Sequence, residues 1–166
     1  MKTIQKTKSY KASAEKVFDC IDDLGVTGMH MTESSMPMMG GKMNLEFLTV
    51  HKTGPHTTYR WTGKALWWKL DFTVEVTNWI RGKEKTWETI GATKMILYSW
   101  FQMNLNVEQT SQETIAYLSI SYQRPKGVFN KILCFLLGDW YCTWCLNNML
   151  NDTETKLLPG QSPKKS

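Results

Sequence analysis

The sequence lacks several features that would assign the protein to a specialised class. No five or six Lys and Arg residues stand together, and the net charge of +5 is modest, so nucleic-acid binding is not expected. The first ten residues are charged and contain no apolar segment typical of a signal peptide. The longest apolar stretch, residues 128–150, is interrupted by Lys131, Asp139 and Asn147. Because a spanning helix needs about 20 mostly apolar residues, we expect no stable membrane insertion.

Common catalytic and metal-binding motifs are also missing. There is no G-x-S-x-G motif and no phosphate-binding loop, and His30, His51 and His56 show no metal-ligand spacing. We therefore expect neither a metal nor a cofactor. Cys142 and Cys145 have C-x-x-C spacing, but they fall late in a predicted helix, where the helix dipole does not activate a thiol.

The four cysteines all lie within apolar patterns of a chain that shows no export signal. Reduced, buried thiols are the rule for such a chain, so a cytoplasmic location is expected.

Aromatic residues and methionine are abundant. Eight Trp, six Tyr, six Phe and ten Met among 166 residues exclude a disordered chain and indicate one ordinary domain. We expect a single domain over residues 1–151, followed by a flexible tail over residues 152–166.

The periodicity of apolar residues changes along the chain. Residues 3–11 predict a strand, Ser13 to Gly25 a helix, and residues 26–43 a Met- and Gly-rich loop with one short helical turn. Six further strands follow, among them residues 45–51, 70–77, 94–107 and 113–123, and short turns between them indicate antiparallel pairing. A long helix is predicted from Val128 to about Asn151. The stripe expected to cover the sheet is Phe129, Ile132, Leu133, Leu136, Leu137, Trp140 and Trp144.

Two stretches carry a resemblance to a known family. Residues 10–19 (YKASAEKVFD) look like the opening strand-to-helix signature of the START-like superfamily, and the stretches YRWTG (59–63), FTVEV (72–76) and WETIG (87–91) are similar to its central hairpins. This SRPBCC group includes polyketide cyclases/dehydrases, birch-pollen-allergen-like proteins and lipid-transfer domains. The resemblance implies an α+β helix-grip fold, in which a curved antiparallel seven-stranded sheet wraps around a long C-terminal helix and encloses a cavity for an apolar ligand.

The aromatic excess fits such a cavity, because ligand pockets are lined mostly by apolar and aromatic side chains. The residues expected to line it are Tyr59, Trp61, Phe72, Trp87, Tyr98, Trp100, Leu133, Leu136 and Trp140, with Met38 and Met39 from the loop. The methionines of this loop are open to three interpretations: an adaptable lid, incidental packing, or soft ligands for Cu(I) without the usual regular spacing.

Acid–base groups offer only weak catalytic candidates. Asp71 and Glu75 share a polar strand face and are interpreted as solvated ion pairs, with Arg60 nearby. Asp139 lies among apolar helix residues and must reach water or a partner. An enzyme on this fold would draw on Asp139, Tyr98 or Arg60 for proton transfer.

Three functions remain open at this point. The first is a non-enzymatic binding or carrier protein for a hydrophobic small molecule or lipid, entered between the Met-rich loop and the start of the last helix. The second is a polyketide cyclase/dehydratase-like enzyme that uses the same cavity. The third is a protein-interaction module that acts through the apolar C-terminal helix. For the surplus apolar surface of that helix, a homodimer is favoured over a membrane-surface contact, because the helix itself lacks a Lys/Arg-rich face.

Overall fold

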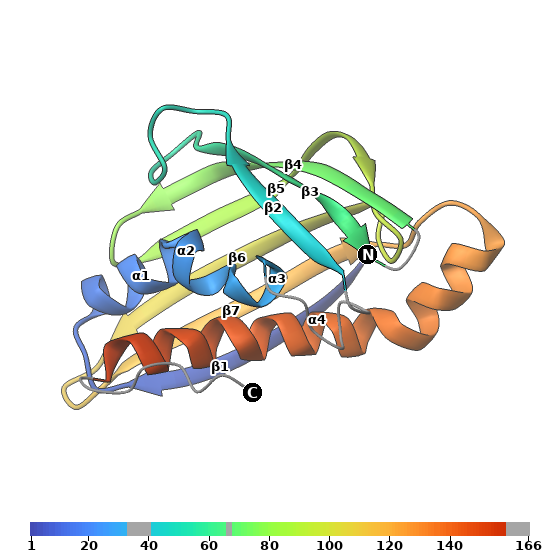
Figure 1. Ribbon diagram of the computed structural model, residues 1–166. Helices are drawn as coiled ribbons and strands as arrows, with labels where there is room; N and C mark the ends of the chain where they lie inside the picture. Colours follow the sequence, from blue (N-terminus) through green and yellow to red (C-terminus); the bar gives the residue numbers. More distant parts are fainter. Residues whose placement is uncertain (33–40, 66–67, 159–166) are drawn as a thin grey trace.

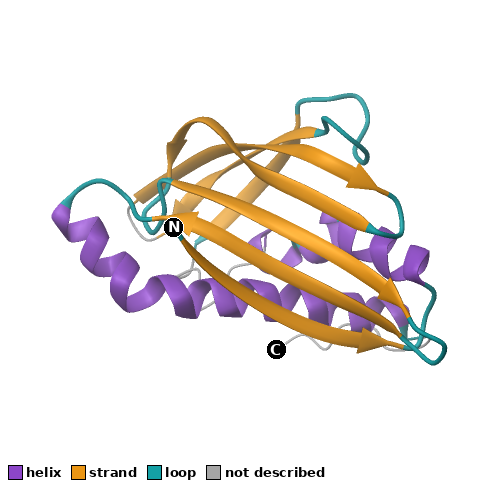
Figure 2. Cartoon of the chain, turned by 180° about the vertical axis from the view of Figure 1, so that it is seen from behind, coloured by secondary structure: helices purple, strands orange, loops and turns teal. Residues whose placement is uncertain are grey.

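The computed structural model describes residues 1–32, 41–65 and 68–158. The strands are β1 (Lys2–Tyr10), β2 (Lys42–Phe47), β3 (Thr58–Ala65), β4 (Trp68–Ile80), β5 (Glu84–Lys94), β6 (Trp100–Gln109) and β7 (Thr114–Gln123). The helices are α1 (Ala14–Asp22), α2 (Leu24–Thr27), α3 (Met29–Thr32) and α4 (Val128–Leu157). All seven strands form one antiparallel sheet that curves around α4, as Figures 1 and 2 show from opposite sides. The predicted fold class is confirmed.

Alternation along each strand determines which face of the sheet looks toward α4. In β4, Phe72, Val74 and Val76 are buried, whereas the side chains between them are more exposed. Successive side chains of a strand point to opposite faces, so the apolar set forms one concave wall. The tight turn into β5 contains Gly82 at φ +74°, a backbone conformation that glycine adopts without strain.

The first strand of the chain closes the sheet beside the last one. β1 lies antiparallel to β7, with Lys2 opposite Tyr122 and Tyr10 opposite Thr114. The other neighbours follow the order of the chain, from β7 back to β2 at the far edge. The three short helices that follow β1, α1, α2 and α3, lie on the open side of the sheet beside the C-terminal half of α4 (Figure 1).

The face of α4 that covers the sheet differs from the predicted stripe. Phe129 and Leu136 were assigned to the covering face, but they are 61% and 64% exposed. The buried residues of this helix are instead Cys134, Gly138, Cys142, Leu146, Met149, Leu150 and Thr153. Because α4 carries apolar residues on most sides, periodicity alone could not select its inward face. Small residues let the helix approach closely: a Cβ on Gly138 would lie 3.5 Å from the Tyr122 hydroxyl oxygen.

Several element boundaries also differ from the predicted ones. α4 continues to Leu157, so residues 152–157 of the expected tail are helical. The strand expected over 94–107 begins only at Trp100, and residues 95–98 belong to no strand. The strand expected over 45–51 ends at Phe47. None of the helices in the described part of the chain is both long and apolar enough to cross a bilayer.

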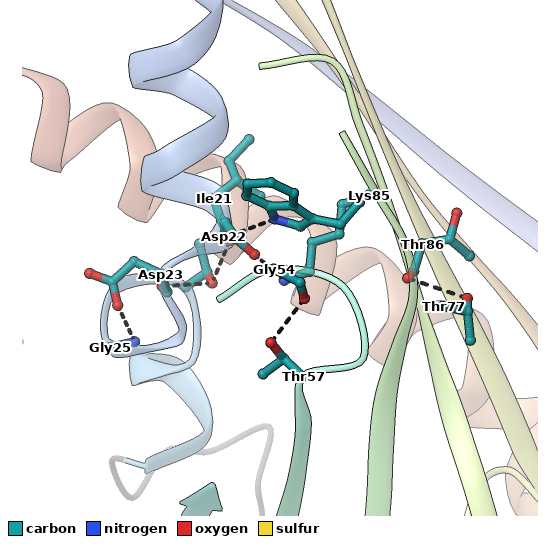
Figure 3. A network of polar contacts seen from close by, with 11 residues as sticks. Ile21, Asp22, Asp23, Gly25, Gly54, Thr57, Thr77, Lys85 and Thr86 are labelled. Atoms are coloured by element: carbon teal, nitrogen blue, oxygen red, sulfur yellow. Dashed lines mark hydrogen bonds and ion pairs between the residues drawn. The ribbon is translucent and has the colours of Figure 1, made fainter. Parts of the chain in front are cut away.

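A buried ion pair joins α1 to the sheet. The ammonium group of Lys85 lies 2.5 Å from one carboxylate oxygen of Asp22, and the indole N–H of Trp79 donates to the other at 3.0 Å. The side chains of Lys85 and Asp22 are only 3% and 5% exposed, respectively, and are thus as buried as the apolar core. Figure 3 shows this contact at the junction of α1 with the neighbouring loop and strands. A buried charge is tolerated only when it is paired, so this contact fixes the position of α1.

Candidate ligand-binding cavity

A cavity of about 270 Å³ lies between the concave face of the sheet, the short helices α2 and α3, and the middle of α4. This volume is close to the lower end of the range of about 300–1,000 Å³ that ligand pockets occupy. Its walls come from parts of the chain that are distant in sequence, so the cavity depends on the complete fold. Among the described residues that line it there is no Asp, Glu, Lys or Arg.

Most of the aromatic residues predicted from the sequence stand at this cavity. Tyr59 and Trp61 line it from β3, and they lie opposite Val74 and Phe72 of β4, which also line it. The other predicted residues that reach the wall are Trp87, Tyr98, Leu133 and Trp140. The structure places these side chains around one space, and their role in binding stays a prediction.

Two predicted residues lie elsewhere. Leu136 is absent from the wall and faces outward on α4. Trp100 is absent as well, whereas Phe101 and Met103 of the same strand line the cavity. A shift of one residue exchanges the two faces of a strand. The prediction that Trp100 lines the cavity therefore chose the wrong face of β6 as the inward one. Met38 and Met39 lie outside the described residues.

Sequence reasoning missed a second group of lining residues. Met95, Ile96 and Leu97 line the cavity from the segment between β5 and β6, which was expected to be strand. Another set comes from α2, α3 and their flanks: Leu24, Thr27, Gly28, His30 and Met31. The concentration of Met and Gly after residue 25 was the one signal in the sequence for this wall.

The polar groups of the wall are largely satisfied by the protein itself. The Tyr98 hydroxyl donates to the Gly138 carbonyl oxygen at 2.6 Å and contacts the Cys142 sulfur at 3.1 Å. The Thr27 hydroxyl contacts the carbonyl oxygen of Ile21 at 3.1 Å. Tyr59 differs: burial and the nearby Asp22 raise the pKa of its phenol, and no hydrogen bond to a described residue contributes. Among the wall hydroxyls, that of Tyr59 is therefore the most available to a ligand.

His30 is a buried imidazole beside the cavity. Its ring packs edge-on against Trp144, with 5.1 Å between centroids, and neither ring nitrogen makes a hydrogen bond to another described residue. The Asp152 carboxylate lies 3.9 Å from Nδ1. Burial nevertheless dominates and lowers the pKa of His30 to about 4, with the Thr27 backbone opposing it. The side chain is neutral at physiological pH, so it adds no charge to the wall.

The candidates for proton transfer are separated from the cavity. The Asp139 carboxylate accepts from the Tyr122 hydroxyl at 2.5 Å and pairs with Lys2, and these contacts lower its pKa. Arg60 forms a two-point ion pair with Asp71, at 2.7 Å for each contact, on the solvated face of the sheet. Neither Asp139 nor Arg60 lines the cavity, so their assignment to a catalytic wall is not supported. Of the three weak candidates only Tyr98 lines it, and its hydroxyl is engaged.

The cysteines are free thiols in the described chain. Burial raises the pKa of Cys142 to about 12 and raises that of Cys145 above its usual range. A protonated thiol is a poor nucleophile and a poor metal ligand, so neither thiol is activated by its surroundings. Cys142 is buried, whereas Cys145 is partly buried and lines the cavity.

Comparison with known proteins yields matches in structure and none in sequence. No family model matches the chain, and no curated protein matches it. The solved structure of TTHA0849 from Thermus thermophilus aligns with a TM-score of 0.67 at 15% identity, covering 95% of this chain and 100% of that one. The Zhui aromatase/cyclase from Streptomyces sp. R1128 aligns with a TM-score of 0.67 at 9% identity, covering 95% and 96%.

A third neighbour was solved with small aromatic molecules. Norcoclaurine synthase from Thalictrum flavum, in complex with dopamine and hydroxybenzaldehyde, aligns with a TM-score of 0.65 at 17% identity, covering 98% of this chain and 89% of that one. Identities this low establish the fold and leave the activity open. The protein therefore has the helix-grip fold that these solved structures share.

Proposed function

We propose that the protein binds or carries an uncharged, mostly apolar small molecule or lipid in the cavity between its sheet and α4. The observation that carries this proposal is the wall itself, which is built from aromatic, aliphatic and Met side chains without a charged group among the described residues. An ionised ligand would lose its hydration there without gaining a partner, so a neutral ligand is favoured. Affinity comes mainly from buried apolar area, at about 25 cal/mol per Å².

The Tyr59 hydroxyl is proposed to orient the ligand, because it is the wall hydroxyl with no hydrogen bond to a described residue. The entrance is proposed beside Trp140, whose side chain both lines the cavity and is 52% exposed. Leu133 and Leu137 on the same helix are partly exposed lining residues and extend this opening.

A cyclase- or dehydratase-like enzyme is the second candidate, and it is favoured by the aromatase/cyclase and synthase among the structural neighbours. It would have to act with Tyr98 or with the neutral groups of the wall, since Asp139 and Arg60 lie elsewhere. A cytoplasmic location remains part of the proposal. A homodimer through α4 remains a prediction.

Native mass spectrometry of protein purified from its own cells tests the proposal. We expect an additional mass of a few hundred daltons that denaturing extraction releases as a neutral, apolar compound. Val74→Trp should abolish it, because Val74 is 1% exposed and lines the cavity, so the larger side chain occupies the ligand's space. Val50→Trp is the matched control, because Val50 is fully exposed in the turn after β2.

Titration with the neutral fluorophore N-phenyl-naphthylamine separates the remaining outcomes. Saturable binding that Val74→Trp removes and Val50→Trp preserves supports a ligand cavity even if the native ligand is lost during purification. Binding that is unchanged in Val74→Trp, with circular dichroism identical to that of the wild type, overturns the proposal.

A further inference from the structure

The wall of the cavity contains a buried histidine whose ring has no hydrogen-bond partner among the described residues. The His30 side chain is 7% exposed, and it lines the cavity from α3. Both ring nitrogens are buried, and neither forms a hydrogen bond with a described residue. Nearly all buried polar groups in native proteins have a partner, so an orphaned one indicates a role outside the packing of the core. In a cavity wall, the partner that fits this role is a ligand.

The surroundings of His30 determine which hydrogen-bonding role of its ring is left open. Burial lowers its pKa to about 4, so at neutral pH the ring carries one N–H donor and one lone pair. The Asp152 carboxylate lies 3.9 Å from Nδ1, and the Thr27 backbone likewise favours a protonated ring. The carboxylate therefore favours the proton on Nδ1, which leaves the lone pair on Nε2. No described residue donates a hydrogen bond to that lone pair.

The packing around the ring allows a molecule in the cavity to reach this lone pair. On the α4 side of the ring, Trp144 packs edge-on against it with 5.1 Å between centroids, and Asp152 faces Nδ1. The ring itself forms part of the cavity wall. The χ2 torsion of a histidine has a broad energy minimum, so the ring can turn Nε2 toward a bound molecule at low cost. A ligand in the cavity is therefore the donor that His30 can meet.

The open lone pair restricts the chemistry of the partner. It accepts a hydrogen bond and cannot donate one, so a ketone, ester or ether oxygen gains nothing from it. An ammonium group would lose its hydration in a wall that has no charged group among the described residues. A neutral hydroxyl group on an otherwise apolar molecule meets both conditions. The Tyr59 hydroxyl, by contrast, can donate or accept, so it does not distinguish hydroxyl ligands from ether or ketone ligands.

We propose that Nε2 of His30 accepts a hydrogen bond from a hydroxyl group of the ligand, and that the cavity thereby selects apolar alcohols or phenols. This inference rests on the proposed function, because it requires a ligand in the cavity. The aromatic and aliphatic wall binds the body of the molecule, and His30 recognises its hydroxyl group. Because His30 belongs to α3, the bound hydroxyl group points toward this helix.

A pair of probes that differ in the hydroxyl hydrogen tests this inference. β-Naphthol donates a hydrogen bond, whereas its methyl ether retains the oxygen and cannot donate. Displacement of N-phenyl-naphthylamine measures the affinity of each probe. We expect the wild type to prefer β-naphthol by about fivefold to tenfold, the effect of one neutral hydrogen bond. His30→Phe should abolish this preference and change the affinity for the methyl ether by less than about twofold. His51→Phe is the matched control, because it makes the same change at an exposed ring.

Two results overturn this inference and leave the proposed cavity standing: equal affinities of the wild type for the two probes, or a preference that survives in folded His30→Phe. A wild type that binds neither the probes nor the dye overturns the proposed function, and the inference with it.

A second variant and a direct measurement guard against misfolding of His30→Phe. His30→Gln retains an acceptor oxygen and should keep part of the preference, and circular dichroism establishes that each variant is folded. In the wild type itself, the nitrogen NMR resonance of His30 Nε2 should shift when β-naphthol binds and stay unchanged with the methyl ether. Equal spectra with the two probes would remove His30 from the contact.

Discussion

The ammonium group of Lys85 lies between the carboxylate of Asp22, 2.5 Å away, and the ring of Trp87, 4.7 Å from its centroid. Trp87 forms part of the cavity wall, so a buried ion pair stands directly behind that wall. The cavity remains free of charge because this lysine is held by α1 and does not turn toward it. The position of Lys85 therefore couples the packing of α1 to the shape of the cavity.

Asp22→Asn should destabilise the protein by about 3–5 kcal/mol, because it leaves Lys85 buried without a counter-ion. Urea denaturation near neutral pH measures this loss. Burial lowers the pKa of Lys85. The deficit should therefore shrink as the pH rises toward the usual lysine pKa of about 10.4, because the unfolded chain then also begins to lose the proton of Lys85. Asp19→Asn is the control, since it removes a carboxylate from the exposed pair with Arg81 and should cost far less. Equal losses of stability in Asp22→Asn and Asp19→Asn would show that the buried ion pair contributes no more than the exposed one.

Acidification should destabilise the protein through His30. The pKa of His30 is lowered to about 4 in the folded protein, against about 6.5 in the unfolded chain. Between these values the unfolded chain binds one more proton, so stability is complete above pH 6.5 and decreases as the pH falls toward 4. This part of the loss amounts to about 2 kcal/mol between pH 7 and pH 5. His30→Phe should remove it and His56→Gln, at an exposed ring, should not; a pH dependence shared by all three proteins would assign the loss to other groups.

Two tyrosines of the cavity wall should respond differently to loss of their hydroxyl groups. Tyr98→Phe removes the hydrogen bond to the Gly138 carbonyl and should cost about 1 kcal/mol in the free energy of unfolding. Tyr59→Phe removes no hydrogen bond to a described residue and should leave stability within about 0.5 kcal/mol of the wild type. Thermal and urea denaturation of both variants measure the difference. A larger loss for Tyr59→Phe would mean that its hydroxyl has a structural partner and is not reserved for a ligand.

Ligand retention should be sensitive to Trp87 and insensitive to Asp139. Trp87→Ala removes a large buried part of the wall and should weaken binding of N-phenyl-naphthylamine, whereas Asp139→Asn changes a group outside the cavity and should not. Fluorescence titration provides both affinities, and circular dichroism verifies the fold. If Asp139→Asn lost an enzymatic turnover while it retained dye binding, the cyclase-like alternative would replace the carrier.

Gly63→Ala should loosen the edge of the sheet. A Cβ at Gly63 would lie 2.3 Å from the Lys42 carbonyl oxygen and 2.9 Å from the Met43 Cα, both backbone atoms of the neighbouring strand β2. Such contacts require the strands to separate, and the cost is expected to be about 1–3 kcal/mol. Thr62→Ala, the adjacent change in the same strand, is the control in denaturation experiments. A neutral Gly63→Ala would indicate that β2 adjusts freely.

The sequence predicted the inward face of an element correctly wherever a single periodicity of apolar residues dominated. Strict alternation around Phe72 and Val74 gave β4 its inward face, and short turns gave the antiparallel order. The same reasoning failed at α4, where apolar residues occur on nearly every side and the inward face depends on the small residues Cys134, Gly138 and Cys142. It also failed for Trp100, because the start of β6 depends on contacts that periodicity does not encode.

The pairing of Lys2 with Tyr122 has a consequence for how the molecule assembles. During synthesis β1 emerges first, yet its partner strand β7 is made only after the other strands, and α4 follows later still. β1 must therefore wait without its sheet partner, and the concave wall stays open to solvent until α4 has been made. Such non-local pairing slows folding. The cavity between the sheet and α4 can therefore close only after α4 has been made.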